Sequence, residues 1–207
     1  MKRLIFFTIL LILLNFVFFS SIPVMDNEIH SSLLTSLWIE NPEKSHITFH
    51  EFDNEHKEFW LGFKAKKNQS VNLIVGVPEI ERLKDFKVKA VIMGPAIEEE
   101  FKWGYFSDKE DIMKEMKYNW GAMVVLPEGE KMEYTDPISD ISSWVVLLHT
   151  FIAPADGDYF IMIIPDTELE NGKIEIVFGE EFDFSVADIL QMPYWRKFID
   201  EFYEIDN

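Results

Sequence analysis

Apolar side chains occupy every second position through most of the chain between residues 38 and 180. In one such segment Phe59, Leu61, Phe63 and Ala65 fall on the same face of an extended backbone. A period of two is the pattern of a strand with one buried face. We therefore expect eight or nine strands, the clearest of which span residues 45–52, 58–65, 71–77, 88–93, 121–126, 144–152, 158–164 and 174–178.

The segment 153–165 predicts the strand around which the others are arranged. Pro154, Asp156 and Gly157 form a turn, and a short apolar run to Ile164 follows. The run is too short for a buried helix and is bounded by turn residues, so it indicates a central strand. No alternation of strands with long helices is present, which disfavours a parallel sheet.

A polar turn at Lys66-Lys67-Asn68 separates two of the predicted strands, 58–65 and 71–77. Two strands joined by so short a turn predict an antiparallel hairpin. Asn68 begins the sequence Asn-Gln-Ser, a glycosylation acceptor sequence, and would lie at the tip of that hairpin.

These patterns together predict an all-β protein, an antiparallel jelly-roll-like β-sandwich over residues 38–180. Residues 26–37 are mostly polar, with one apolar patch at the end. Two interpretations stay open for them, a spacer leading to the sandwich or a first strand.

An apolar N-terminal segment precedes the sandwich. A basic start at Lys2-Arg3 is followed by Leu4–Phe19 and then by a polar exit, the pattern of a secretory signal over residues 1–25. Bulky Phe18 and Phe19 occupy the third position before the candidate cleavage sites, where a small residue is required. An uncleaved membrane anchor over residues 4–24 is the alternative. Both place the sandwich outside the cytoplasmic membrane.

The tail, residues 181–207, changes from a period of two to a helical period. We expect an amphipathic helix from Pro193 to Tyr203, with proline at the first helical position. Its apolar side presents Trp195, Phe198, Ile199 and Phe202. This side either packs on the sandwich or docks a partner protein, because a lone three-turn helix is marginal in water. A capping box at Ser107 and Glu110 predicts another short helix between two strands.

Composition narrows the possible partners. The chain carries 37 acidic and 19 basic residues, a net charge of −18 at pH 7. Such a surface repels phosphate backbones and anionic lipid headgroups, so we expect no nucleic-acid partner. The expected partners are a membrane-bound or cell-surface protein, and the membrane itself if the N-terminal segment is uncleaved. No cysteine is present, which excludes disulfides, thiolate metal sites and cysteine nucleophiles.

Two sequence segments, APADGDYFIMI (153–163) and GKIEIVFG (172–179), resemble the closing hairpin of bacterial pre-peptidase C-terminal domains. In that family an "aPadGtYyl.v" strand is followed by a "GkY.L.v" strand, and Ile174 stands where the family usually has an aromatic residue. Residues 38–179 also resemble uncharacterised exported archaeal and bacterial proteins with the same strand order. The resemblance implies an exported jelly-roll-like sandwich without catalytic residues, of the kind that accompanies surface enzymes or binding proteins.

Metal ligands are weak candidates at two places. His46 and His50 share one strand face but lie roughly 13 Å apart at strand rise, and His56 adds a third ligand only if the turn folds back. Asp166, Glu168 and Glu170 crowd one turn, and oxygen-rich loops can hold calcium. The alternative is an acidic turn without a metal. We therefore expect no cofactor, with calcium as the alternative.

Catalytic templates are missing from the sequence: no G-x-S-x-G, no H-E-x-x-H and no glycine-rich phosphate loop occurs. We therefore expect a non-catalytic binding or structural module at the cell surface. Two alternatives stay open, an extracytoplasmic hydrolase with a scattered carboxylate and histidine site, and a calcium-stabilised adhesion module.

Overall fold

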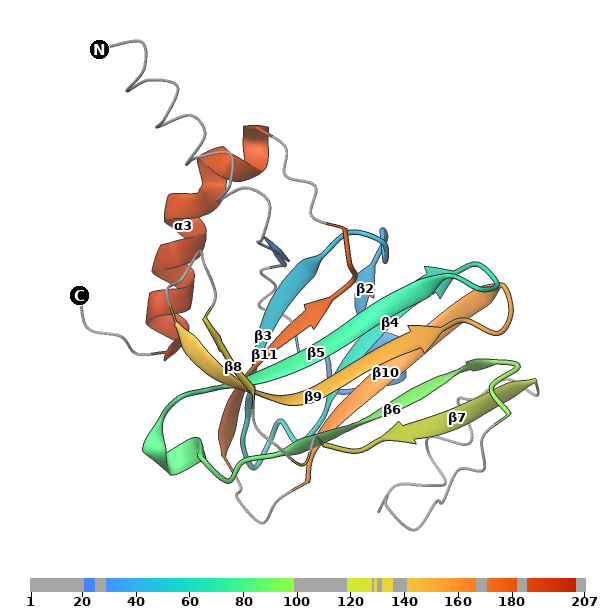
Figure 1. The fold of residues 1–207 in the computed structure, drawn as a ribbon, viewed down its shortest axis with the longest axis horizontal. Coiled ribbons are helices and arrows are strands. Elements are labelled where there is room, and N and C mark those ends of the chain that lie inside the picture. The colour runs from blue at the N-terminus through green and yellow to red at the C-terminus, as the bar shows by residue number, and fades with distance from the viewer. Residues whose placement is uncertain are drawn as a thin grey trace.

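The computed structural model describes residues 21–24, 29–98, 119–127, 129, 132–135, 141–166, 171–181 and 186–203. Two β-sheets pack face to face, and a C-terminal helix lies against the outer side of one of them (Figure 1). The predicted all-β sandwich is thereby confirmed. The predicted capping box at Ser107 and the apolar segment 4–19 lie outside the described residues.

The six-stranded sheet contains, in spatial order, β1 (Ile22–Pro23), β3 (His46–Phe52), β11 (Gly172–Phe178), β5 (Ser70–Pro78), β9 (Ser142–Ile152) and β8 (Met132–Thr135). The five-stranded sheet contains β2 (Leu37–Ile39), β4 (Phe59–Ala65), β10 (Gly157–Pro165), β6 (Val88–Pro95) and β7 (Trp120–Val125). Two short 3-10 turns, η1 (Leu33–Thr35) and η2 (Glu81–Leu83), and the helix α3 (Val186–Tyr203) complete the described elements.

The strands of the first half pair with those of the second half in reverse order. β3 pairs with β11, β4 with β10, β5 with β9 and β6 with β7, all antiparallel. This is the winding of a jelly roll, in which a long ribbon of paired strands is folded over into two sheets.

The winding corrects two predicted hairpins. β4 and β5 lie in different sheets, and so do β10 and β11, so neither pair is a hairpin. The Lys66–Asn68 turn instead leads from one sheet to the other. It runs beside the β9–β10 connection, which also passes between the sheets, and its backbone N–H groups are hydrogen-bonded to that connection. The Asn68 N–H donates to the Ala153 carbonyl at 2.7 Å, and the Lys67 N–H to Asp156 Oδ1 at 2.6 Å.

The prediction of a central strand at 158–164 is confirmed. β10 lies between β4 and β6, and both of its faces are buried from Tyr159 to Ile163. Tyr159 stacks on Phe63 with ring centroids 5.8 Å apart, and its hydroxyl lies 2.7 Å from the Ala155 carbonyl oxygen. The tyrosine therefore fills the space between the sheets and ties the turn before β10 to the core.

The first described residues belong to the six-stranded sheet. β1 runs parallel to β3, and the Ile22 and Val24 N–H groups donate to the Ser45 and Ile47 carbonyls at 2.8 Å. The end of the predicted anchor 4–24 is thus a sheet strand. Within the predicted spacer, Leu33–Thr35 forms a turn and Leu37 begins β2, because Leu37 and Ile39 are buried in the core.

The C-terminal helix is longer than predicted. α3 begins at Val186 and continues through Pro193, which lies inside the helix and not at its first position. An internal proline removes one backbone hydrogen bond, and the burial of the following face offsets that cost. Within the described part of the chain, no helix is both long and apolar enough to cross a bilayer.

Candidate ligand-binding pocket

The outer face of the six-stranded sheet carries a hollow. Strand alternation places Ile174, Ile176 and Val75 in the core between the sheets. The intervening residues of β11 and β5, such as Glu175 and Gly76, therefore face outward. Helix α3 packs on part of this outer face, where it contacts Phe49 of β3, and its last turn reaches Lys173 and Glu175 of β11.

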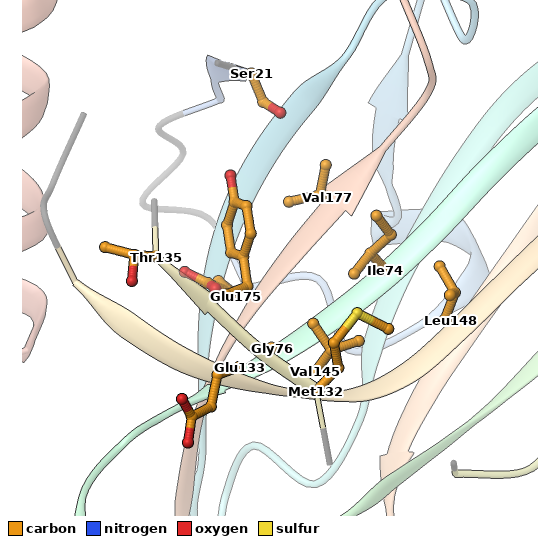
Figure 2. Close-up of a pocket in the computed structure, with 11 residues that line it drawn as sticks. Ser21, Ile74, Gly76, Met132, Glu133, Thr135, Val145, Leu148, Glu175 and Val177 are labelled. Carbon is orange, nitrogen blue, oxygen red and sulfur yellow. The ribbon is translucent and has the colours of Figure 1, made fainter. Parts of the chain in front are cut away.

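A cavity of about 390 Å³ lies on this outer face beside α3 (Figure 2). Its volume falls within the range of small-molecule sites, about 300–1,000 Å³. Most of its wall is apolar, and the described residues that line it are Ser21, Ile74, Gly76, Met132, Glu133, Tyr134, Thr135, Val145, Leu148, Glu175 and Val177.

Gly76 explains why Glu175 can lie against the sheet at this place. A Cβ atom at Gly76 would lie 2.5 Å from Glu175 Oε1 and 2.8 Å from its Cγ. The register between β5 and β9 also shifts between Val75 and Gly76. An isolated glycine in a strand often marks such an irregularity or a close approach, and both occur at this position.

Glu175 is the buried acidic group of the pocket, with 2% of its surface exposed. Its Oε2 lies 3.5 Å from the Tyr203 hydroxyl, so the last turn of α3 reaches the carboxylate. Lys173, on the same strand face, donates from Nζ to the Phe202 carbonyl at 2.7 Å and lies 3.8 Å from Glu51 Oε2. The end of the helix is thereby fixed next to the pocket.

Another part of the rim is formed by β8, an edge strand. All four β8 residues are exposed, and Met132 and Tyr134 are large apolar side chains among them. Thr135 Oγ1 lies 3.0 Å from Ser142 Oγ, a contact that ties β8 to β9. Figure 2 shows Glu175, Thr135 and Glu133 on the side of the view nearer α3, and Ile74, Val177 and Leu148 on the other.

The predicted histidine ligands lie on β3 and the following turn. His50 packs between Phe52 and Phe59, with ring centroids 4.6 and 5.0 Å away. His56 Nδ1 contacts Asp53 Oδ1 at 2.9 Å, and His46 Nε2 lies 3.1 Å from the Asn41 carbonyl. Among the described residues, no three His, Cys, Asp or Glu side chains are grouped so that they could hold a metal ion.

Burial lowers the pKa of His50 to about 4, and repulsion from His56 adds to the shift. The hydrogen bond from His56 lowers the pKa of Asp53 to about 2, and the same bond raises the pKa of His56. Burial also lowers the pKa of His46. The lowered pKa values of His46 and His50 make β3 sensitive to acid, whereas the raised pKa of His56 acts in the opposite direction.

The first prediction concerns that sensitivity. Between its unfolded pKa of 6.5 and its folded pKa of about 4, His50 takes up a proton mainly in the unfolded chain. This raises the population of the unfolded state as pH falls, and we expect His50 to lower the free energy of unfolding by about 2 kcal/mol at pH 5 relative to pH 7. Urea denaturation at the two pH values should show that His50→Leu loses less of its free energy of unfolding between pH 7 and pH 5 than the unsubstituted protein does.

His56→Gln is a control of opposite sign. The raised pKa of His56 stabilises the fold below pH 6.5 and loses its effect as pH rises, so this variant should lose more stability at pH 5 than at pH 8. Asp53 and His30 also act on His50, and both stay in place in the leucine variant. An undiminished acid loss in His50→Leu would show that another group is responsible.

The structure describes part of the predicted acidic turn and all of the predicted glycosylation acceptor sequence. Asp166 pairs with Lys89, Oδ1 to Nζ, at 3.0 Å, while Glu168 and Glu170 lie outside the described residues. Calcium binding stays a prediction.

Asn68 is exposed at the crossing turn with a positive φ of 66°, a conformation that asparagine tolerates better than most residues. Its modification also stays a prediction.

The four docking candidates on α3 pack on the sandwich, the first of the two predicted alternatives. Trp195 and Ile199 are buried, and Phe198 and Phe202 lie with ring centroids 6.2 and 5.6 Å from Phe49. Phe198, Ile199 and Phe202 thus pack over Phe49 on the outer face of β3, and docking of a partner at this helix stays a prediction.

The pocket residues were missed by the sequence interpretation. Glu175 occupies the polar position of an alternating strand, which by itself indicates a solvent-exposed side chain. Gly76, in the middle of an otherwise apolar strand, was the available signal of a close approach.

No protein-family model and no curated protein matches the chain. Among solved structures, the pre-peptidase C-terminal domain of collagenase from Bacillus anthracis aligns with 69% of this chain and 93% of its own, at 9% identity and a TM-score of 0.39. CorA, a surface-associated copper-binding protein of Methylomicrobium album BG8, aligns with 70% of this chain and 96% of its own, at 9% identity and a TM-score of 0.33. Values this low transfer no property to this chain.

Proposed function

We propose that this protein is an exported, non-catalytic β-sandwich that binds a small, mainly apolar ligand in the pocket on the outer face of its six-stranded sheet. The observation that carries the proposal is the cavity of about 390 Å³, whose apolar lining includes Ile74, Val145, Leu148 and Val177. A concave, mostly apolar cavity with few polar groups is the usual form of a small-molecule site.

The proposed location outside the cytoplasmic membrane rests on the sequence. The basic start and the apolar run Leu4–Phe19 suit a signal or an anchor. Ser21, two residues after that run, lines the pocket. If the segment is an uncleaved anchor, the pocket lies close to the outer surface of the cytoplasmic membrane, where apolar ligands concentrate.

The second prediction tests binding in the pocket. Leu148→Trp places a larger side chain at a half-exposed lining position, and we expect it to weaken binding of 1-octanol roughly tenfold, because the ring occupies the space of the ligand. The measurement is displacement of the neutral dye Nile red by 1-octanol, followed by fluorescence.

Ile152→Trp is the matched control. Ile152 lies on the same strand, is exposed, and does not line this pocket, so its replacement should leave 1-octanol binding unchanged. Octanol that fails to bind the unsubstituted protein, or that binds Leu148→Trp equally well, would refute the proposed function. Turnover on a glycan or peptide panel would instead favour the hydrolase alternative.

A further inference from the structure

The outer side of helix α3 presents two large apolar side chains to water. Leu190 and Tyr194 have 77% and 66% of their surfaces exposed. They are four residues apart and therefore neighbours on one face of the helix, and Lys197 continues the same row. We call Leu190, Tyr194 and Lys197 the outer ridge. The other side of α3 is already packed on the sandwich through Ile199, so the outer ridge is a second surface of the helix.

The charge around the outer ridge differs from that of the whole chain. Residues 190–199 contain Arg196 and Lys197 and no acidic residue, although the net charge of the chain is −18. Both basic side chains are exposed, and Lys197 Nζ lies 3.4 Å from Glu201 Oε1, one turn further along. Apolar, tyrosine and basic side chains on one helix are typical of the membrane–water interface, where rings and long basic side chains reach from the acyl boundary to the headgroups.

The apolar N-terminal run enters the sheet near this half of the helix. Leu4–Phe19 ends two residues before Ser21, and Ser21 precedes β1, which pairs with the first residues of β3. The C-terminal half of α3 packs on Phe49, further along the same strand. In Figure 1 the N-terminal half of α3 is the upper one, and it extends past the level of β1, drawn in dark blue. The run therefore reaches the sandwich at the end where the outer ridge begins.

A lipid surface fits the outer ridge better than a protein partner does. Two apolar side chains cannot bury the about 800 Å² per partner that a stable protein interface usually needs. A protein already tethered to a membrane needs far less contact area, because the tether gives its surface a high effective concentration at the bilayer. The short distance along the chain from Phe19 to β1 provides such a tether.

We propose that the outer ridge lies in the headgroup region of the bilayer that holds Leu4–Phe19, and that it fixes the orientation of the sandwich on the membrane. Leu190 reaches the boundary of the acyl chains, while Tyr194 and Lys197 stay at the level of the headgroups. This inference rests on the location given in the proposed function, because it requires an uncleaved anchor. It does not depend on any ligand of the pocket.

The test uses the absence of cysteine from the chain, which lets one introduced cysteine be labelled uniquely. The full chain with Leu190→Cys is labelled with the fluorophore bimane and reconstituted in phosphatidylcholine nanodiscs. We expect phosphatidylcholine with a doxyl group near the head of its acyl chain to quench most of the fluorescence. Iodide in the water should quench little of it, because the label lies among lipids.

Leu126→Cys is the matched control, since Leu126 is also a leucine with more than half of its surface exposed. It follows β7 at the opposite end of the sandwich, where the register runs from Val125 through Ala90 and Ile163 to Phe59 at the start of β4. A bimane label at this position should be quenched by iodide and not by the doxyl lipid.

A second substitution tests what holds the helix on the lipid. Tyr194→Asp, added to the chain labelled at position 190, should lower quenching by the doxyl lipid and raise quenching by iodide, because a charged side chain leaves the interface for water. Tyr194→Phe keeps the ring and should retain the quenching of the parent. Tyr194 is exposed, so both variants should fold.

The outcomes separate this inference from the pocket. A label at position 190 that is open to iodide and unaffected by the doxyl lipid overturns the inference, and so does lipid quenching that Tyr194→Asp leaves unchanged. A full chain that nanodiscs do not retain overturns both the inference and the anchored location. Binding of 1-octanol, measured as above, is expected to be unaffected by each of these results, and its failure would refute the pocket alone.

Discussion

Ile163→Asp should unfold the protein. Ile163 lies in β10 with none of its surface exposed, between β4 and β6 in the five-stranded sheet. Replacing a buried isoleucine by a small residue lowers the free energy of unfolding by about 2–5 kcal/mol, and burying an unpaired charge lowers it further. The combined loss is a large part of the free energy of unfolding of a typical domain, which is about 5–15 kcal/mol. Circular dichroism at 25 °C should show loss of the sheet signal.

Ile152→Asp makes the same change at a position with 61% of its surface exposed, near the end of β9. We expect its free energy of unfolding to stay within about 0.5 kcal/mol of the unsubstituted protein, because an exposed aspartate stays hydrated. Cooperative folding of Ile163→Asp with an unchanged melting temperature would show that β10 is not central.

Ile199→Asp should detach α3 from the sheet. Ile199 has 1% of its surface exposed and is clustered with Ile141 and Tyr203 over Phe49. As for Ile163, an unpaired carboxylate buried at this contact should lower the free energy of unfolding by on the order of several kcal/mol. Because the stability of a protein helix comes mainly from packing of its apolar face, and α3 also contains Pro193, the tail should then lose its helical structure.

The measurements are the melting temperature and the rate of limited proteolysis after residue 181. Leu190→Asp, on the same helix at 77% exposure, is the matched control and should leave both unchanged. Equal behaviour of the two variants would mean that the packing of α3 contributes nothing to stability. A lower melting temperature for Ile199→Asp alone confirms that the helix is part of the folded unit.

Periodicity was sufficient to predict the main strands but not the sheet in which each lies. Phe59 to Ala65 and Val71 to Val77 alternate as strands do, and both are strands. The turn between them contains the residues of a hairpin turn, yet its N–H groups bond to Ala153 and Asp156 of another connection. Pairing across the sandwich is a long-range property, and local turn residues do not encode it.

The helix and the pocket show the same limit. Pro193 signals a helix start, but the packing of Ile199 and Tyr203 on Phe49 sustains a helix that begins before the proline. Glu175 has the sequence position of an exposed residue. It becomes the polar group of a pocket only because Gly76 and Tyr203, distant in sequence, lie around it.

The nested pairing of strands has a consequence for the order of folding. During synthesis β3 and β4 emerge early, while their partners β11 and β10 emerge near the end. Among the strands that the structure describes, only β6 with β7 and β8 with β9 pair with the next one in sequence. Contacts of such high sequence separation carry a large loop-closure entropy and slow the search for the native state. Because β11 lies between β3 and β5, we expect the six-stranded sheet to be completed late, and the apolar faces of the early strands to stay uncovered until β10 and β11 have been made.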